Sequence, residues 1–260
     1  MKVNCAYLTH KGNVRENNED SMLVQDVIYS NQSFTNAISI EIEDESHLVF
    51  AVADGMGGHA RGEVASHAVL EFIHNNFSSF TSEEGIRKTI DDAKFHLDDL
   101  VRKDNNAYGL GTTLCGIVIK GNTGLLFNVG DSRLYKRKDG FLEKLTRDHS
   151  FVQYLVDNGI ITEEEMSFHP KKNIVTSAVS GDLMKESPEM FFKEITIEEG
   201  DQFLICTDGV WESLSLEELE VCMLDAELIK KTDVLTENIL RYGGLDNLSI
   251  IMLEVLNLQS

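Results

Sequence analysis

The stretch LVFAVADG, residues 48–55, places six consecutive apolar residues directly before an Asp-Gly pair. A short apolar run bounded by a turn signal predicts a buried β-strand, here over residues 47–53. The stretch FLICTDG, residues 203–209, repeats this arrangement. We therefore expect two buried strands that each end at an aspartate, Asp54 in the first and Asp208 in the second.

Three further expected strands also carry acidic residues at one end. These strands cover 125–129, 248–255 and 21–27, with Gly130-Asp131 after the first, Asp246-Asn247 before the second and Glu19-Asp20 before the third. If these ends meet at one edge, the carboxylates converge, and a divalent cation is needed to offset their repulsion. Oxygen ligands alone favour Mg²⁺ or Mn²⁺ over zinc. Turn chemistry is the better explanation of any single Asp-Gly pair, but it explains five such strand ends together less well. Periodicity does not show which strand ends are neighbours.

The remaining pattern predicts a layered α+β fold. Turn residues at 121–124 and 139–140 separate neighbouring strands as hairpins, which indicates antiparallel pairing. Helical spacing of apolar residues predicts two long helices, over 64–73 and over 86–100, the second opened by a capping box at Thr81 and Glu84. Four shorter helices are expected over 149–158, 163–167, 216–223 and 233–242. Because strands and helices occur in clusters rather than in βαβ alternation, a doubly wound sheet is disfavoured.

Composition and charge narrow the possible partners. The chain is 42% hydrophobic and 26% charged, as in ordinary globular proteins. It has only two prolines and no linker-like run, so residues 1–260 are expected to form a single domain. The formal net charge of −21 argues against nucleic acid and anionic membranes as partners. A monomer is expected, because no apolar stripe is left over once the helices are packed.

The cysteines and the N-terminus indicate the compartment. Cys5, Cys115, Cys206 and Cys222 form no CxxC pair and are expected to be buried thiols. The first 20 residues lack an apolar targeting segment, and no apolar run approaches the roughly 18 residues that span a bilayer. These features predict a cytoplasmic protein.

Six short motifs follow one another along the chain. They are RENNED (15–20), DGMGGH (54–59), GTT (111–113), VGDSR (129–133), TDG (207–209) and DN (246–247). In this order they resemble the metal-dependent Ser/Thr protein phosphatases of the 2C type, the PPM family, and residues 148–176 are similar to its small bacterial members. The resemblance covers nearly the whole chain. It implies a four-layer αββα fold, in which a central antiparallel β-sandwich is flanked by helical layers, with a two-metal centre at one end.

The resemblance also implies a set of metal ligands. They are Asp54 bridging two Mn²⁺ or Mg²⁺ ions, Asp20 and the Gly55 carbonyl on the first ion with Glu19 reaching it through water, Asp208 and Asp246 on the second, and Asp131 with Asp208 on a third, looser ion. Two ions about 3.5–4 Å apart lower the pKa of a shared water and direct it in line at phosphorus. The implied activity is hydrolysis of phosphoserine and phosphothreonine in proteins, opposing a Ser/Thr kinase of the same cell.

Two further residues have implied roles in catalysis. The guanidinium of Arg15 can hold two phosphate oxygens at once and is expected to clamp the substrate. His59 is expected to protonate the departing Ser or Thr alkoxide. Taken alone, Arg15 is a surface residue countering Glu16 and Glu19, and His59 is an exposed loop residue; only the complete motifs favour the catalytic roles.

One segment departs from the family pattern. Ser177 stands where these phosphatases commonly have an arginine, and Ser180 is an additional residue. This segment follows the expected flap, residues 148–172, which borders the active site in relatives. The departure concerns the flap and substrate preference and leaves the implied metal ligands unchanged.

Two other functions are compatible with parts of the sequence. A pseudophosphatase would keep the fold and bind phosphoproteins or a regulatory partner without turnover, but such proteins usually lack a metal carboxylate, and none is missing here. A calcium-binding acidic protein is disfavoured, because the chain lacks the D-x-[DN]-x-[DN]-G spacing of a helix-loop-helix calcium site.

Overall fold

Two six-stranded sheets form the centre of the computed structural model, which describes residues 1–43, 46–57, 61–104, 107, 109–184, 187–225 and 227–258. The first sheet has the order β11 (Phe141–Lys144), β10 (Arg133–Lys138), β14 (Gln202–Cys206), β15 (Leu248–Asn257), β1 (Lys2–His10) and β4 (Ile38–Glu43). The second has the order β13 (Phe191–Thr196), β9 (Thr123–Val129), β8 (Leu114–Lys120), β5 (Leu48–Ala53), β2 (Ser21–Val24) and β3 (Val27–Ser30). All neighbouring strands in both sheets pair antiparallel.

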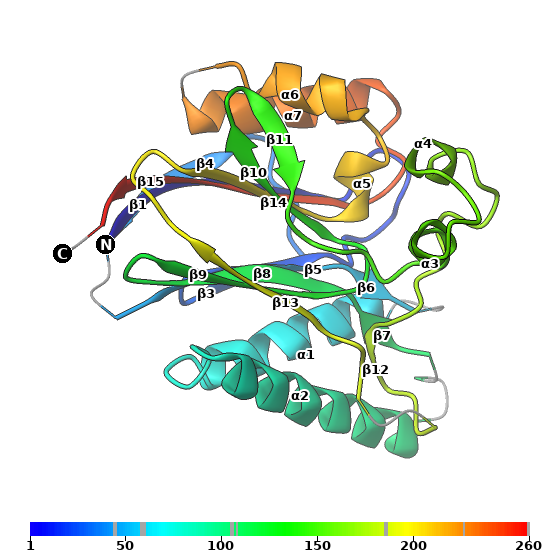
Figure 1. The fold of residues 1–260 in the computed structure, drawn as a ribbon. Coiled ribbons are helices and arrows are strands. Elements are labelled where there is room, and N and C mark those ends of the chain that lie inside the picture. The colour runs from blue at the N-terminus through cyan, green and yellow to red at the C-terminus, as the bar shows by residue number, and fades with distance from the viewer. Residues whose placement is uncertain are drawn as a thin grey trace.

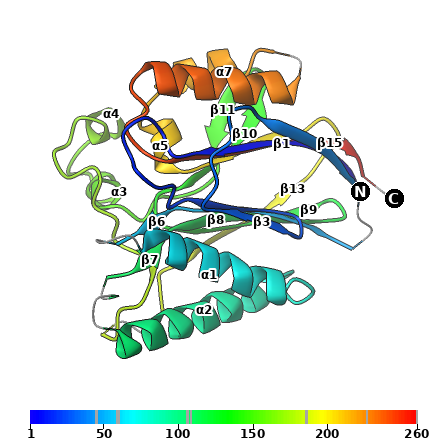
Figure 2. The same ribbon diagram turned by 180° about the vertical axis from the view of Figure 1, so that it is seen from behind.

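The two sheets lie face to face, and helices cover their outer faces (Figure 1). Helices α1 (Gly62–Asn75) and α2 (Glu83–Lys103) cover the second sheet, whereas α6 (Leu216–Cys222) and α7 (Leu228–Arg241) cover the first. Seen from behind, the order of layers is the same (Figure 2). The four-layer αββα arrangement confirms the predicted fold class.

Several short elements gather beside one end of the sandwich. They are β6 (Gly55–Met56), β7 (Gly111–Thr112) and β12 (Val179–Ser180), which form a small three-stranded sheet, and the helices α3 (Phe151–Asp157), α4 (Glu163–Met166) and α5 (Asp208–Trp211). Both views place α3 and α4 at the end of the sandwich where α5 and β6 lie (Figures 1 and 2). The expected flap, residues 148–172, therefore contains two short helices at this end.

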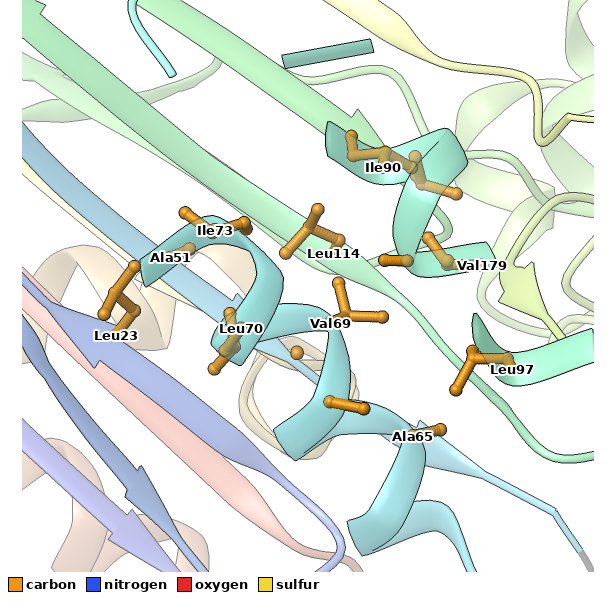
Figure 3. Packing of buried hydrophobic residues seen from close by; sticks show 14 of the residues in the cluster. Leu23, Ala51, Ala65, Val69, Leu70, Ile73, Ile90, Leu97, Leu114 and Val179 are labelled. Atoms are coloured by element: carbon orange, nitrogen blue, oxygen red, sulfur yellow. The ribbon is translucent and has the colours of Figure 1, made fainter. Parts of the chain in front are cut away.

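Strand β5 shows how the sequence builds the core. All six of its residues are buried, and alternate residues face opposite layers. Val49 and Ala51 belong to the apolar cluster beneath α1 and α2, whereas Phe50 and Val52 belong to the cluster between the sheets. Figure 3 shows the first cluster, where Val69 and Leu70 of α1 lie close to the strands of the second sheet. A strand buried on both faces has no polar alternation, which explains its uninterrupted apolar run.

Most predicted elements are confirmed, with local differences. Helices α4 and α6 each begin with a capping box, at Thr162 and at Ser215. The box predicted at Thr81 is wrong: α2 is capped by Ser82, whose hydroxyl accepts a hydrogen bond from the Gly85 N–H. Helix α7 starts at Leu228, five residues earlier than predicted. The sequence did not indicate this start, because polar residues interrupt the apolar pattern in the first turns of the helix.

Two further expectations, on the cysteines and on membrane-spanning segments, can be compared with the structure. All four cysteines are buried and free. None of the helices in the described ranges is long and apolar enough to cross a membrane.

Candidate metal centre

Four acidic residues at strand ends come together at one end of the sandwich, two from each sheet. Asp20 directly precedes β2, and Asp54 directly follows the neighbouring strand β5. In the facing sheet, Asp208 lies just after β14, and Asp246 lies just before the neighbouring strand β15. Antiparallel pairing places the end of one strand beside the start of the next, so each sheet brings its two acids to the same edge.

Hydrogen bonds across the two sheets hold Asp20. The hydroxyls of Thr207 and Ser249 donate to Asp20 Oδ2 at 2.8 and 2.9 Å. Its other oxygen, Oδ1, is buried and has no hydrogen-bond partner. An oriented carboxylate with one unsatisfied buried oxygen suits a cation ligand, because leaving such an atom unpaired is otherwise costly.

The acids raise one another's pKa values in the metal-free protein. Burial raises the pKa of Asp20 to about 7 and that of Asp208 to about 6, and the charges of neighbouring aspartates add to both shifts. Burial, followed by the charge of Asp208, raises the pKa of Asp131 to about 8. The same two causes raise the pKa of Asp54, whose carboxyl shares a hydrogen bond with that of Asp208. Such a cluster retains protons near neutral pH unless cations replace them.

The backbone of the loop after β5 is held by two buried threonines. Thr112 Oγ1 donates to the Asp54 carbonyl at 2.8 Å, and Thr113 Oγ1 accepts from the Asp54 N–H at 3.1 Å. The Thr113 hydroxyl also contacts Ser132 Oγ at 2.8 Å, next to Asp131. The GTT motif therefore supports the loop that carries Asp54, and Ser132 supports the same motif from the loop that carries Asp131.

Gly55 lies where no side chain fits. A Cβ at this position would lie 2.3 Å from the Gly62 carbonyl oxygen and 2.5 Å from that of Glu19. The close approach brings Glu19 to the start of α1, where burial and the charge of Glu63 raise the pKa of Glu19. Glu63 Oε2 is also buried without a partner. The sequence analysis did not single out Glu63, because an acidic residue in the first turn of a helix is common on dipole grounds alone.

Arg15 lies at the exposed rim of the cluster. Its Nη2 contacts Asp246 Oδ2 at 2.7 Å, and the side chains of Arg15 and Asp246 are 54% and 39% exposed. The hydrogen-bonded partner of Arg15 is thus one of the implied metal ligands, and the charge of Glu19, which the surface interpretation named, also acts on Arg15. This position leaves the guanidinium within reach of solvent and of the acids.

Two asparagines organise the chain before β2. Asn247 Oδ1 accepts from the Glu19 N–H, and Asn247 Nδ2 donates to the Lys11 and Asn17 carbonyls. Asn247 also contacts the neighbouring Asp246, through its backbone N–H, which donates to Asp246 Oδ1 at 2.8 Å. The second asparagine, Asn18, is buried and was not predicted as a site residue.

Ser177, the residue that departs from the family pattern, faces inward. It is buried, and its hydroxyl donates to the Glu189 carbonyl at 3.1 Å. The residue therefore ties the segment after the flap to the chain leading into β13.

The oxygen-bearing side chains of this cluster suit divalent cations, although they do not form a complete coordination shell. Within the described ranges, no three His, Cys, Asp or Glu side chains are gathered tightly enough to form a ready-made metal site. Arg15 engages Asp246, and two hydroxyls engage one oxygen of Asp20. The available donors are nonetheless oxygens throughout, and Asp20 Oδ1 is unsatisfied. His59 lies outside the described residues.

The αββα sandwich and its acidic end are the features expected of a metal-dependent phosphatase. Residues 27–241 match the family model of protein phosphatase 2C, and the chain belongs to this family. It is 33% identical over 258 residues to the serine/threonine protein phosphatase PstP of Mycobacterium tuberculosis, covering 95% of this chain but only 44% of PstP. It is 29% identical over 260 residues to the serine/threonine phosphatase Stp of Listeria monocytogenes, covering 97% of this chain and 96% of Stp.

Solved structures show the same fold. A crystal structure of M. tuberculosis PstP superposes with a TM-score of 0.82 at 30% identity, covering 99% of this chain and 100% of that one. The PstP catalytic domain in complex with two manganese ions gives a TM-score of 0.78 at 30% identity, with the same coverage. The phosphatase of Streptococcus agalactiae gives 0.82 at 28% identity, covering 97% of this chain and 99% of that one.

Proposed function

We propose that this chain is a Mn²⁺- or Mg²⁺-dependent phosphatase that hydrolyses phosphoserine and phosphothreonine in proteins. The observation that carries the proposal is the meeting of acids from two facing sheets around a buried, unsatisfied Asp20 oxygen. Membership of the 2C family and the two manganese ions in the related PstP domain support it. Bound at these acids, two ions would supply the Lewis acidity that makes water nucleophilic enough to attack phosphorus.

The proposed ligands divide between the two sheets. The second sheet and its flanking loops contribute Asp20, Asp54 and the Gly55 carbonyl, with Glu19 acting through water. The first sheet contributes Asp208 and Asp246, and Asp131, with Asp208, would hold a third and looser ion. Asp54 would be shared between the two main ions, and its carboxyl interacts with the charges of both Asp208 and Asp20.

Arg15 would bind the substrate phosphate, and His59 would protonate the leaving oxygen. A cation held by Asp246 would weaken the ion pair between Asp246 and Arg15, and the guanidinium could then turn toward a phosphate. An alkoxide is a poor leaving group without a proton, which is the role proposed for His59. With a chain charge of −21, the phosphate must be attracted by short-range cations rather than by the overall field.

The proposed substrates are phosphoproteins modified by a Ser/Thr kinase of the same cell, and the proposed active form is a monomer. Purified protein with Mn²⁺ should release phosphate from a phosphothreonine peptide, and a chelator should abolish the release. Binding of the peptide without release, in protein shown by calorimetry to be loaded with Mn²⁺, would instead support the pseudophosphatase.

Replacing Arg15 tests the phosphate clamp. For Arg15→Ala we expect KM for the phosphothreonine peptide to rise about 10-fold, with a smaller effect on kcat, because ground-state binding is lost. Stability should change by less than about 1 kcal/mol, since the exposed Arg15–Asp246 pair contributes little to folding. Arg102→Ala is the matched control, because Arg102 forms a similar exposed pair with Asp99 on α2. Unchanged KM in Arg15→Ala would remove Arg15 from substrate binding.

A further inference from the structure

A stacked arginine connects the flap to the acidic end of the sandwich. Arg133, the first residue of β10, lies over the Trp211 ring with its Cζ 3.5 Å from the ring centroid. Its Nη2 and Nε also donate to Asp148 Oδ2, at 2.7 and 3.0 Å. Asp148 is the first residue of the flap, and its side chain is only 1% exposed. An arginine that is half-buried, stacked on an indole and hydrogen-bonded through two nitrogens to one buried carboxylate is held in one geometry more firmly than an exposed ion pair.

Trp211 also connects Arg133 to the loop that carries Asp131. Trp211 lies in α5, three residues after Asp208, and its Nε1–H donates to the Asp131 carbonyl at 3.1 Å. The Arg133 guanidinium thus contacts both the flap and the indole that fixes the Asp131 backbone. The strand end beside Asp131 is also tied to the flap directly, because the His149 N–H donates to the Gly130 carbonyl at 2.7 Å.

The flap is anchored at both ends, whereas its second helix, α4, buries no side chain. At its far end, Lys172 Nζ contacts Glu212 Oε2 at 3.2 Å, next to Trp211. Between the ends, a cavity of about 280 Å³ separates the flap helices from α5 and α6, and Trp211 and Met166 are among its lining residues. Phe168 is 88% exposed, so the apolar side chains of the flap are not all packed inward. Helix α3 buries Val152 and Leu155, whereas α4 buries no side chain, so the end anchors should decide whether the α4 part of the flap stays docked.

We propose that Arg133 is a positioning residue that couples docking of the flap to binding of divalent cations at the acidic cluster, through Trp211 and the Asp131 backbone. The coupling rests on the proposed metal centre, whereas the flap anchor does not. Energetic coupling between two sites is reciprocal: ions that order the Asp131 loop favour the docked flap, and a docked flap raises affinity for the ions. Trp211 carries this coupling, because it contacts both Arg133 and the Asp131 carbonyl.

Hydrogen–deuterium exchange of residues 148–172, measured with chelator and with Mn²⁺, tests both parts. The variant that removes the anchor is the double substitution Arg133→Met with Asp148→Asn, because Arg133→Met alone leaves a buried carboxylate with only Lys144, 3.5 Å away, as a counter-charge. The variant that removes only the coupling is Trp211→Phe, which keeps an aromatic face for Arg133 but lacks the N–H donor. Arg87→Met is the control, since Arg87 also stacks on an aromatic ring, Phe192, and pairs with Glu83 away from the site.

The expected results separate the variants. Mn²⁺ should slow exchange of the flap in the natural protein and in Arg87→Met. In the double variant the flap should exchange about 10-fold faster even with chelator, and calorimetry should show Mn²⁺ affinity lowered by about 5-fold or more. Trp211→Phe should keep the slow exchange seen with chelator but lose the additional protection given by Mn²⁺.

Three outcomes would overturn the proposal in different ways. Flap exchange in the double variant equal to that of the natural protein would eliminate the anchor. Mn²⁺ binding with the same gain of flap protection in Trp211→Phe as in the natural protein would eliminate the coupling and leave the proposed function intact. A natural protein that binds no Mn²⁺ by calorimetry would overturn both the coupling and the metal centre.

Discussion

Asp54→Asn should lower kcat on a phosphothreonine peptide by at least about 10³-fold, equivalent to roughly 4 kcal/mol of transition-state stabilisation. Asparagine has nearly the same shape, and the threonines that hold the Asp54 backbone remain in place. The substitution removes the charge proposed to be shared between two ions. Steady-state kinetics with saturating Mn²⁺, at matched protein concentration, provide the measurement.

The same substitution should stabilise the metal-free protein. Burial and the charge of Asp208 raise the pKa of Asp54, which shows that the folded state disfavours the ionised carboxyl. A neutral amide relieves this cost, so the melting temperature with chelator should rise while the increase caused by Mn²⁺ shrinks. Asp99→Asn, on the exposed face of α2, should change neither quantity. Full activity in Asp54→Asn together with an unchanged Mn²⁺ shift would refute the proposed role of Asp54.

Opposite effects on activity and stability are expected wherever function requires like charges to be held close together. Asp20 illustrates the same conflict with a different local solution. Thr207 and Ser249 donate to one of its oxygens and favour the ionised form, but burial outweighs them and the pKa remains raised. The fold thus orients the carboxylate without neutralising it, which leaves a divalent cation as the effective counter-charge.

The acidic cluster at one end of the sandwich could be predicted from the sequence, because its acids directly follow or precede apolar runs. LVFAVADG and FLICTDG reveal both the buried strands and the aspartates at their ends, since burial on both faces removes polar residues from the strand itself. The pairing of those ends across two sheets was not predictable from periodicity. It depends on contacts such as that between Thr207 and Asp20, 187 residues apart in the chain.

Other residues gave no usable signal. Ser249 lies near the start of the largely apolar strand β15, where a single hydroxyl residue is commonly structural. Strand β1 was not predicted, because Lys2 and Asn4 interrupt its apolar residues, although it lies in the first sheet between β15 and β4. The stacking of Arg133 on Trp211 joins residues 78 positions apart through tertiary packing alone. Local pattern therefore identifies what a segment buries, whereas partners across the sandwich require the fold.

Without metal, the protein should lose stability as the pH rises from 6.5 to 8.5. Burial raises the pKa of Asp20 to about 7 and that of Asp131 to about 8, compared with 3.8 for an ordinary aspartate. In this range the folded state binds more protons than the unfolded state, so unfolding becomes easier as protons are removed. The stabilising contribution is complete below about pH 4 and is lost as the pH passes through the raised values.

The pH range starts at 6.5 because, at lower pH, two histidines change the stability in the opposite direction. Burial lowers the pKa of His10 and of His149, so their protonation destabilises the folded state mainly below pH 6.5. Above that pH, the aspartates should account for a loss on the order of 2 kcal/mol, or roughly 5 °C in melting temperature.

Thermal melts in chelator across pH 6.5–8.5 measure this loss, and Asp20→Asn should make the slope shallower, because an amide does not titrate. Saturating Mn²⁺ should flatten the profile of the natural protein, because cations stabilise the ionised carboxylates that protons otherwise occupy. The increase in melting temperature caused by Mn²⁺ should therefore be larger at pH 8.5 than at pH 6.5. A chelated protein whose melting temperature stays level or rises over this range would show that the buried aspartates are already ionised and balanced by groups other than a metal.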